Sequence, residues 1–139
     1  MYTKRVVSAA LTAGLFLGAS GLQGVQAQVE YVPKVIATTL HEGELPGMDG
    51  KEMIVKHFAI PPGFIGGKHL HPGPVFVYVL EGVLTVETEA GTESYGPGEL
   101  YPEALNTAMV GRNLSASEDL EILVFQVGDV GKPMMVKVD

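Results

Sequence analysis

Cysteine is absent from this 139-residue chain, and basic residues are few. Without cysteine there is no disulfide, no thiolate zinc site, no iron–sulfur cluster and no cysteine nucleophile, so any bound metal needs nitrogen and oxygen ligands. Nine Lys and Arg residues against 16 Asp and Glu residues give a formal net charge of −7. This balance disfavours nucleic-acid binding, because such proteins neutralise phosphates with basic side chains.

Long hydrophobic runs are also scarce, and the clearest one lies at the N-terminus. Lys4 and Arg5 precede an uncharged apolar stretch, Val6–Leu17, and Val25–Ala27 has small residues where a signal peptidase accepts them. This order is typical of a Sec-type signal peptide, here cleaved after Ala27. The mature chain would then comprise residues 28–139.

The alternative for this segment is an uncleaved membrane anchor. A spanning helix needs about 20 predominantly apolar residues, and glycine interrupts this run repeatedly, at Gly14, Gly18, Gly21 and Gly24. We therefore favour cleavage. No later segment is long enough to span a bilayer, so we expect the mature protein in the bacterial periplasm or secreted, without stable membrane association.

The rest of the chain is a series of short apolar segments separated by glycine and proline. We predict strands over residues 52–60, 75–80, 83–88, 92–95, 120–127 and 134–138. Strands that recur at short intervals between turns indicate a sandwich or barrel, and helix is limited to one turn at residues 115–119. We predict an all-β domain over residues 50–139, preceded by an extended arm over residues 28–49.

One predicted strand, residues 75–80, is apolar at every position. An unbroken apolar run indicates a strand buried on both faces. We therefore expect Phe76 and Tyr78, together with Phe125, to pack in the core.

The most informative segment contains His69 and His71. On an extended backbone, residues i and i+2 point to the same side, so these two imidazoles share a face. Paired imidazoles are good ligands for divalent Fe, Mn, Zn, Ni or Cu. The alternative is a pair of exposed histidines in a polar loop.

This segment resembles the first motif of the cupin superfamily. Gly63, His69, His71 and Gly82 fall in the register of that motif, and residues 77–82 match a common ending of it. A weaker counterpart of the second cupin motif runs from Gly96 to Asn113. The resemblance covers about residues 50–128 and implies an antiparallel jelly-roll barrel, or double-stranded β-helix. It also implies a metal-dependent activity such as that of a dioxygenase, isomerase or decarboxylase, and a homodimer to which residues 28–40 could contribute by pairing with a partner's sheet edge.

The chain departs from the cupin pattern at two ligand positions. Val75 stands where the first motif has a glutamate, and residues 104–109 contain no histidine. A third protein ligand is normal even in open metal sites. Glu103 lies nearest the missing histidine and is anionic, although it could be a solvated loop acid. His57 is the other candidate, although it could line the core or the barrel rim.

We therefore expect a secreted single-domain cupin that binds a divalent transition metal through His69 and His71 and acts on a small organic molecule. One alternative is a non-catalytic barrel that binds a small molecule. Another is a protein that acts through its surface. The sequence does not assign a substrate or a reaction.

Overall fold

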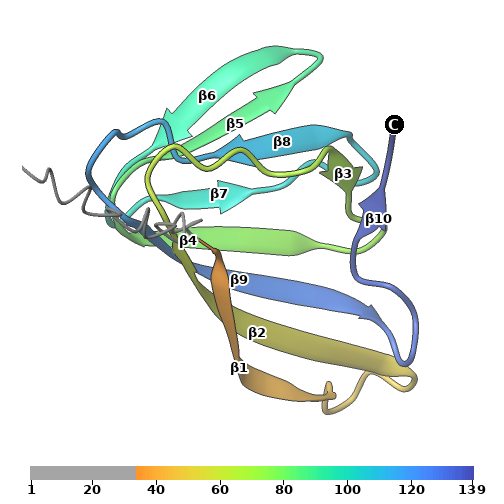
Figure 1. Cartoon of the computed structure of the whole chain (residues 1–139). Helices are drawn as coiled ribbons and strands as arrows, with labels where there is room; N and C mark the ends of the chain where they lie inside the picture. The colour runs from red at the N-terminus through yellow and green to blue at the C-terminus, as the bar shows by residue number, and fades with distance from the viewer. Residues whose placement is uncertain (1–33) are drawn as a thin grey trace, which may run out of the picture. The chain divides into compact units, whose positions relative to one another are not determined.

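The computed structural model describes residues 34–139, which form an all-β domain of two five-stranded sheets. The first sheet has the strand order β1-β2-β9-β4-β7 and the second has the order β10-β3-β8-β5-β6 (Figure 1). All strand pairs are antiparallel. The strands are β1 (Ile36–Glu44), β2 (Lys51–Ile60), β3 (His69–Leu70), β4 (Val75–Glu81), β5 (Leu84–Thr88), β6 (Gly91–Tyr95), β7 (Leu100–Pro102), β8 (Met109–Arg112), β9 (Leu120–Asp129) and β10 (Val136–Lys137).

The two sheets face each other across the hydrophobic core (Figure 1). Alternate residues of a strand point to opposite faces, and the inward-facing set is apolar. It comprises Ile60, Val75, Val77, Val79, Leu84, Val86, Tyr101, Met109, Leu120, Ile122 and Val124. The predicted all-β barrel is confirmed. Residues 115–119 contain no helix, and residues 34–139 include no helix of sufficient length and hydrophobicity to cross a membrane.

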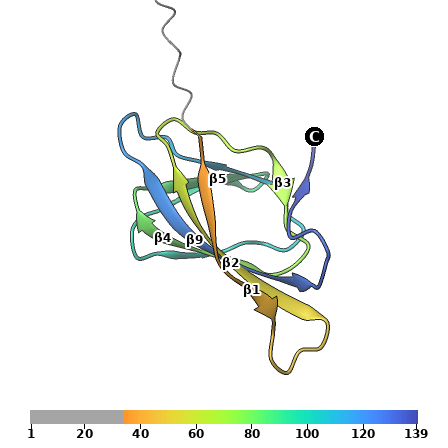
Figure 2. The same cartoon turned by 60° about the horizontal axis from the view of Figure 1, so that its bottom comes forward.

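The segment predicted as an N-terminal arm is in part a strand of the first sheet. β1 pairs with β2 along its length, from Ile36 opposite Ala59 to Glu44 opposite Glu52 (Figure 2). The barrel domain therefore begins before residue 50, because β2 provides β1 with a complete antiparallel partner. The predicted signal peptide and residues 28–33 lie outside the described residues.

The prediction that β4 is buried on both faces is wrong. Val75, Val77 and Val79 are buried, whereas Phe76 and Tyr78 are 41% and 37% exposed. They point to the outer face of the first sheet, which no other element covers within residues 34–139. Phe125 lies opposite Phe76 and is only partly buried. An apolar run does not distinguish a strand covered on both sides from one with an apolar outer face.

The C-terminal segment folds back beside the two central histidines. β10 pairs with β3, with Val136 opposite Leu70 and Lys137 opposite His69 (Figure 1). The backbone N–H of Val138 extends this pairing by donating to the carbonyl of Lys68 at 3.1 Å. The edge strand predicted over residues 134–138 is therefore present, but it is restricted to two residues.

Two motif residues have a purely structural explanation. Gly82 connects β4 to β5 with φ at 76°, a left-handed conformation that favours glycine, and a Cβ there would collide with the carbonyl oxygen of Asp119. Asn113 is 1% exposed, and its amide nitrogen lies 3.1 Å from the carbonyl of Ile60 and 2.9 Å from that of Glu118. Its side-chain oxygen accepts a hydrogen bond from the Ser115 backbone. Asn113 thus holds the loop before β9 against the end of β2.

Candidate metal centre and cavity

His69 and His71 lie side by side at the short strand β3. Their ring centroids are 5.0 Å apart and the rings are perpendicular. Both side chains line the same cavity between the two sheets. His71 is 4% exposed, because β10 and the loop before it cover it on one side.

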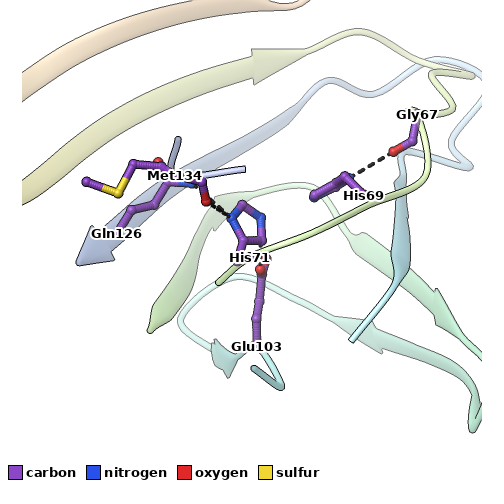
Figure 3. Close-up of polar contacts among 6 residues, drawn as sticks. All are labelled: Gly67, His69, His71, Glu103, Gln126 and Met134. Atoms are coloured by element: carbon purple, nitrogen blue, oxygen red, sulfur yellow. Dashed lines mark hydrogen bonds and ion pairs between the residues drawn. The ribbon is translucent and has the colours of Figure 1, made fainter. Parts of the chain in front are cut away.

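Each imidazole is held through its Nδ1 atom by a backbone carbonyl (Figure 3). Nδ1 of His69 lies 2.8 Å from the oxygen of Gly67, and Nδ1 of His71 lies 2.7 Å from the oxygen of Met134. A carbonyl oxygen only accepts, so these contacts place the proton on Nδ1 in both rings. Nε2 of each neutral ring is then left with a free lone pair, which is the arrangement found in metal-binding histidines.

Glu103 joins the pair from the opposite sheet. It follows β7, where its backbone N–H donates to the carbonyl of Val75 at 2.9 Å. Its Oε2 lies 3.2 Å from Nε2 of His71, and its side chain is 10% exposed. The geometry of this contact is not that of a hydrogen bond, so Oε2 is buried without a hydrogen-bond partner among residues 34–139.

Burial changes the protonation of both members of this pair. It raises the pKa of Glu103 to about 7 and lowers the pKa of His71 below 6.5, although the Met134 carbonyl opposes the second change. Both shifts favour the neutral forms. The pair is therefore not a full ion pair near neutral pH.

The cavity has a volume of about 300 Å³ and a predominantly apolar wall. Its apolar side chains come from both sheets and include Phe58, Ile60, Val77, Leu84, Val86, Met109, Ile122 and Val124. Gln126 adds an amide, whose nitrogen lies 3.4 Å from Nδ1 of His71. A small group of contiguous polar side chains in an apolar cavity is typical of a small-molecule site.

The structure does not bring His57 to this group. Phe58 and Ile60 line the cavity, so His57 points to the outer face of β2, where its Nε2 lies 3.2 Å from Oε2 of Glu121. His41 is exposed on β1. Of the two candidate third ligands, only Glu103 is adjacent to the histidine pair.

The three candidate ligands do not yet converge on one point. Within residues 34–139, no three His, Cys, Asp or Glu side chains are positioned together to hold a metal ion. Glu103 contacts His71, and the ring of His71 lies against that of His69. All three line the cavity.

Two contributors to the site carried no recognisable signal in the sequence. Gln126 is distant along the chain and reaches His71 only because β9 pairs with β4. The Met134 carbonyl is a backbone atom, available from any residue type, and is placed by the return of the chain to β10. Neither could be found by examining residue types near His71.

Comparison with known proteins is consistent with this architecture. No curated protein matches the chain. A cupin domain from Bordetella pertussis is 22% identical with a TM-score of 0.55, covering 69% of this chain and 95% of that chain. A cupin family protein with a double-stranded β-helix fold from Methanocaldococcus jannaschii is 20% identical with a TM-score of 0.56, covering 69% and 82%. A cupin 2 domain-containing protein from Halorhodospira halophila is 21% identical with a TM-score of 0.60, covering 74% and 68%.

At these identities the solved structures establish the fold alone. The family model described as cupin domain matches residues 56–125. That range includes the second half of β2, both histidines of the candidate site, Glu103 and the first six residues of β9. The resemblance stated from the two motifs is therefore confirmed, and this chain belongs to the cupin family.

Proposed function

We propose that this cupin binds one divalent transition metal through Nε2 of His69, Nε2 of His71 and the Glu103 carboxylate, beside a cavity that takes a small organic molecule. The observation that carries the proposal is the orientation of the two imidazoles. Both donate Nδ1–H to a backbone carbonyl, which leaves both Nε2 lone pairs available.

The unpartnered oxygen of Glu103 supports the same assignment. Oε2 is buried, lacks a hydrogen bond among residues 34–139 and faces Nε2 of His71 at 3.2 Å. An ionised oxygen opposite a nitrogen lone pair is unfavourable unless a proton or a cation lies between them. A divalent ion coordinated by both atoms would satisfy them together, so the residues present fit a metal.

Enzymatic activity would use the surroundings of this centre. A bound divalent ion with open positions can polarise a substrate oxygen or activate dioxygen. The apolar wall would exclude water and orient the body of the substrate. The class of reaction is left open.

A non-catalytic barrel that binds a small molecule is the second candidate. The observation that favours it is the lack of three converged metal ligands among residues 34–139. In that case the imidazoles, Glu103 and Gln126 would form hydrogen bonds with a ligand directly.

Metal titration separates the two candidates. Metal-free protein is titrated with Zn²⁺ and Mn²⁺ by calorimetry, and we expect one ion per chain. His69→Ala and His71→Ala should each abolish measurable binding, and Glu103→Gln should weaken it. His57→Ala is the matched control, because it removes an imidazole on the outer face of the sheet. Unchanged stoichiometry and affinity in both motif-histidine variants would overturn the metal site.

We also propose that the protein is exported, with cleavage after Ala27. The support is the order of basic, apolar and small residues at the N-terminus, which is typical of a signal peptide. The mature protein would act in the periplasm or outside the cell.

We propose further that the mature chain forms a homodimer. The outer face of the first sheet presents apolar side chains from neighbouring strands, with Tyr78 directly opposite Leu100. These residues are 37% and 53% exposed, and Phe76 extends the same face. An apolar face of this kind suits a second copy related by a twofold axis, because such an interface is self-complementary.

A further inference from the structure

The wall of the cavity includes two basic side chains, Arg112 and Lys137. Arg112 is neutralised, since its Nη2 lies 2.7 Å from Oε2 of Glu87. Its neighbour Gly111 and the alternate residue Met109 both face the cavity, so the Arg112 side chain leaves β8 on the other side. The Nη2 atom of Arg112 is therefore paired with Glu87, whereas its Nε atom is buried without a hydrogen-bond partner among residues 34–139.

Lys137 is in a different position. It lies directly opposite His69 in the pairing of β10 with β3, so the two side chains share a face. Met135, two residues earlier, also lines the cavity, whereas Met134 and Val136 line a separate surface depression. The alternation of β10 thus places Lys137 at the cavity wall, where the residue is also exposed to solvent. Within residues 34–139 its ammonium forms no ion pair or hydrogen bond.

A cation without a partner at the edge of an apolar cavity favours a particular ligand chemistry. The apolar wall accommodates a hydrocarbon or aromatic body, and the ammonium can pair with a negative charge carried by that body. The rest of the protein is strongly acidic, with a formal net charge of −7, so a general attraction for anions is not expected. Lys137 is a local exception to this negative charge and can select for an anion at the cavity.

We propose that the cavity takes a small organic carboxylate, with its apolar body between the sheets and its carboxylate paired with Lys137. This inference rests on the small-molecule part of the proposed function, and it adds the chemical class of the ligand. It does not depend on the metal, because Lys137 belongs to the C-terminal strand and is not one of the proposed metal ligands.

The test compares two probes of matched size, benzoate and benzyl alcohol, on metal-free protein by NMR titration. We expect benzoate to bind about fivefold more tightly, which corresponds to about 1 kcal/mol, the value of a partly exposed charge pair. Lys137→Gln should abolish this preference and leave the affinity for benzyl alcohol unchanged. Lys137→Arg should retain it.

Lys132→Gln is the matched control, because it removes the same charge from the turn before β10, outside this cavity. Thermal unfolding checks that each variant is folded. Equal preference for benzoate in wild type and Lys137→Gln, or an equal loss in both Gln variants, would overturn the inference while leaving the small-molecule cavity intact. Failure of both probes to bind wild type would instead contradict the small-molecule part of the proposed function, and the inference with it.

Discussion

His71 and Glu103 come from opposite sheets of the barrel and meet with Nε2 and Oε2 3.2 Å apart. Burial disfavours the charged form of both residues, raising the pKa of Glu103 to about 7 and lowering that of His71. The two shifts together disfavour a full ion pair near neutral pH.

The metal-free protein should show a pH-dependent contribution of Glu103 to its stability. The folded pKa of about 7 lies above the ordinary value of 4.5, so the folded state binds more protons than the unfolded state between these values. The stabilising contribution is complete below about pH 4.5 and is lost as the pH rises through 7. It amounts to at most about 3 to 4 kcal/mol at about 1.4 kcal/mol per pKa unit.

This contribution is measured as the free energy of unfolding of wild type minus that of Glu103→Gln, by urea denaturation at several pH values. The lowered pKa of His71 has the opposite effect and costs stability as the pH falls below 6.5, so the change above pH 6.5 reports on Glu103 most directly. The difference should fall between pH 5 and 8. A difference that stays constant or rises would contradict a raised pKa at Glu103.

Asn113→Ala should destabilise the fold by about 3 kcal/mol. The substitution removes the buried amide that contacts the carbonyls of Ile60 and Glu118, and it leaves those acceptors without that donor. Urea denaturation measures the change, with Ser117→Ala as a control at an exposed position of the same loop. A loss below about 1 kcal/mol would show that water replaces the amide without cost.

Cleavage after Ala27 predicts a specific mature protein. Intact-mass measurement of the protein recovered from its own compartment should show a chain that starts at Gln28. The reason is the Val25–Ala27 sequence, which places small residues at the positions that a signal peptidase accepts. Recovery of the full-length chain from the membrane fraction would disprove cleavage.

Tyr78→Lys should convert the proposed dimer into a monomer. The substitution places a charge at the centre of the apolar outer face, where desolvating it would oppose association. Sedimentation velocity measures the change, and Leu114→Lys is the control because Leu114 is an exposed apolar residue outside the strands. A wild-type chain that sediments as a monomer would rule out the dimer.

The sequence alone established the fold class and half of the candidate site. Short apolar segments between glycines predicted strands, because turn chemistry is local and each strand carries its own alternation. The histidine pair was equally local, since two residues in one extended segment share a face whatever surrounds them. The motif resemblance added the barrel, which the family match confirms.

The sequence did not correctly predict the burial of β4. An apolar side chain in a strand does not reveal whether another layer covers it, and Phe76 and Tyr78 lie on a face left open within residues 34–139. The sequence also did not predict that residues 36–44 form a strand of the first sheet. Their pairing with β2 depends on a long-range register and not on any property of the segment itself.

Only the tertiary structure placed one of the two candidate third ligands beside the histidine pair and brought a lysine to the cavity wall. His57 and Glu103 were both plausible by residue type, and the alternation of β2 relative to the core decided against His57. Lys137 lines the cavity because its strand, β10, pairs with β3. These outcomes depend on contacts between residues far apart in sequence, and such contacts are fixed only when the two sheets close around a common core.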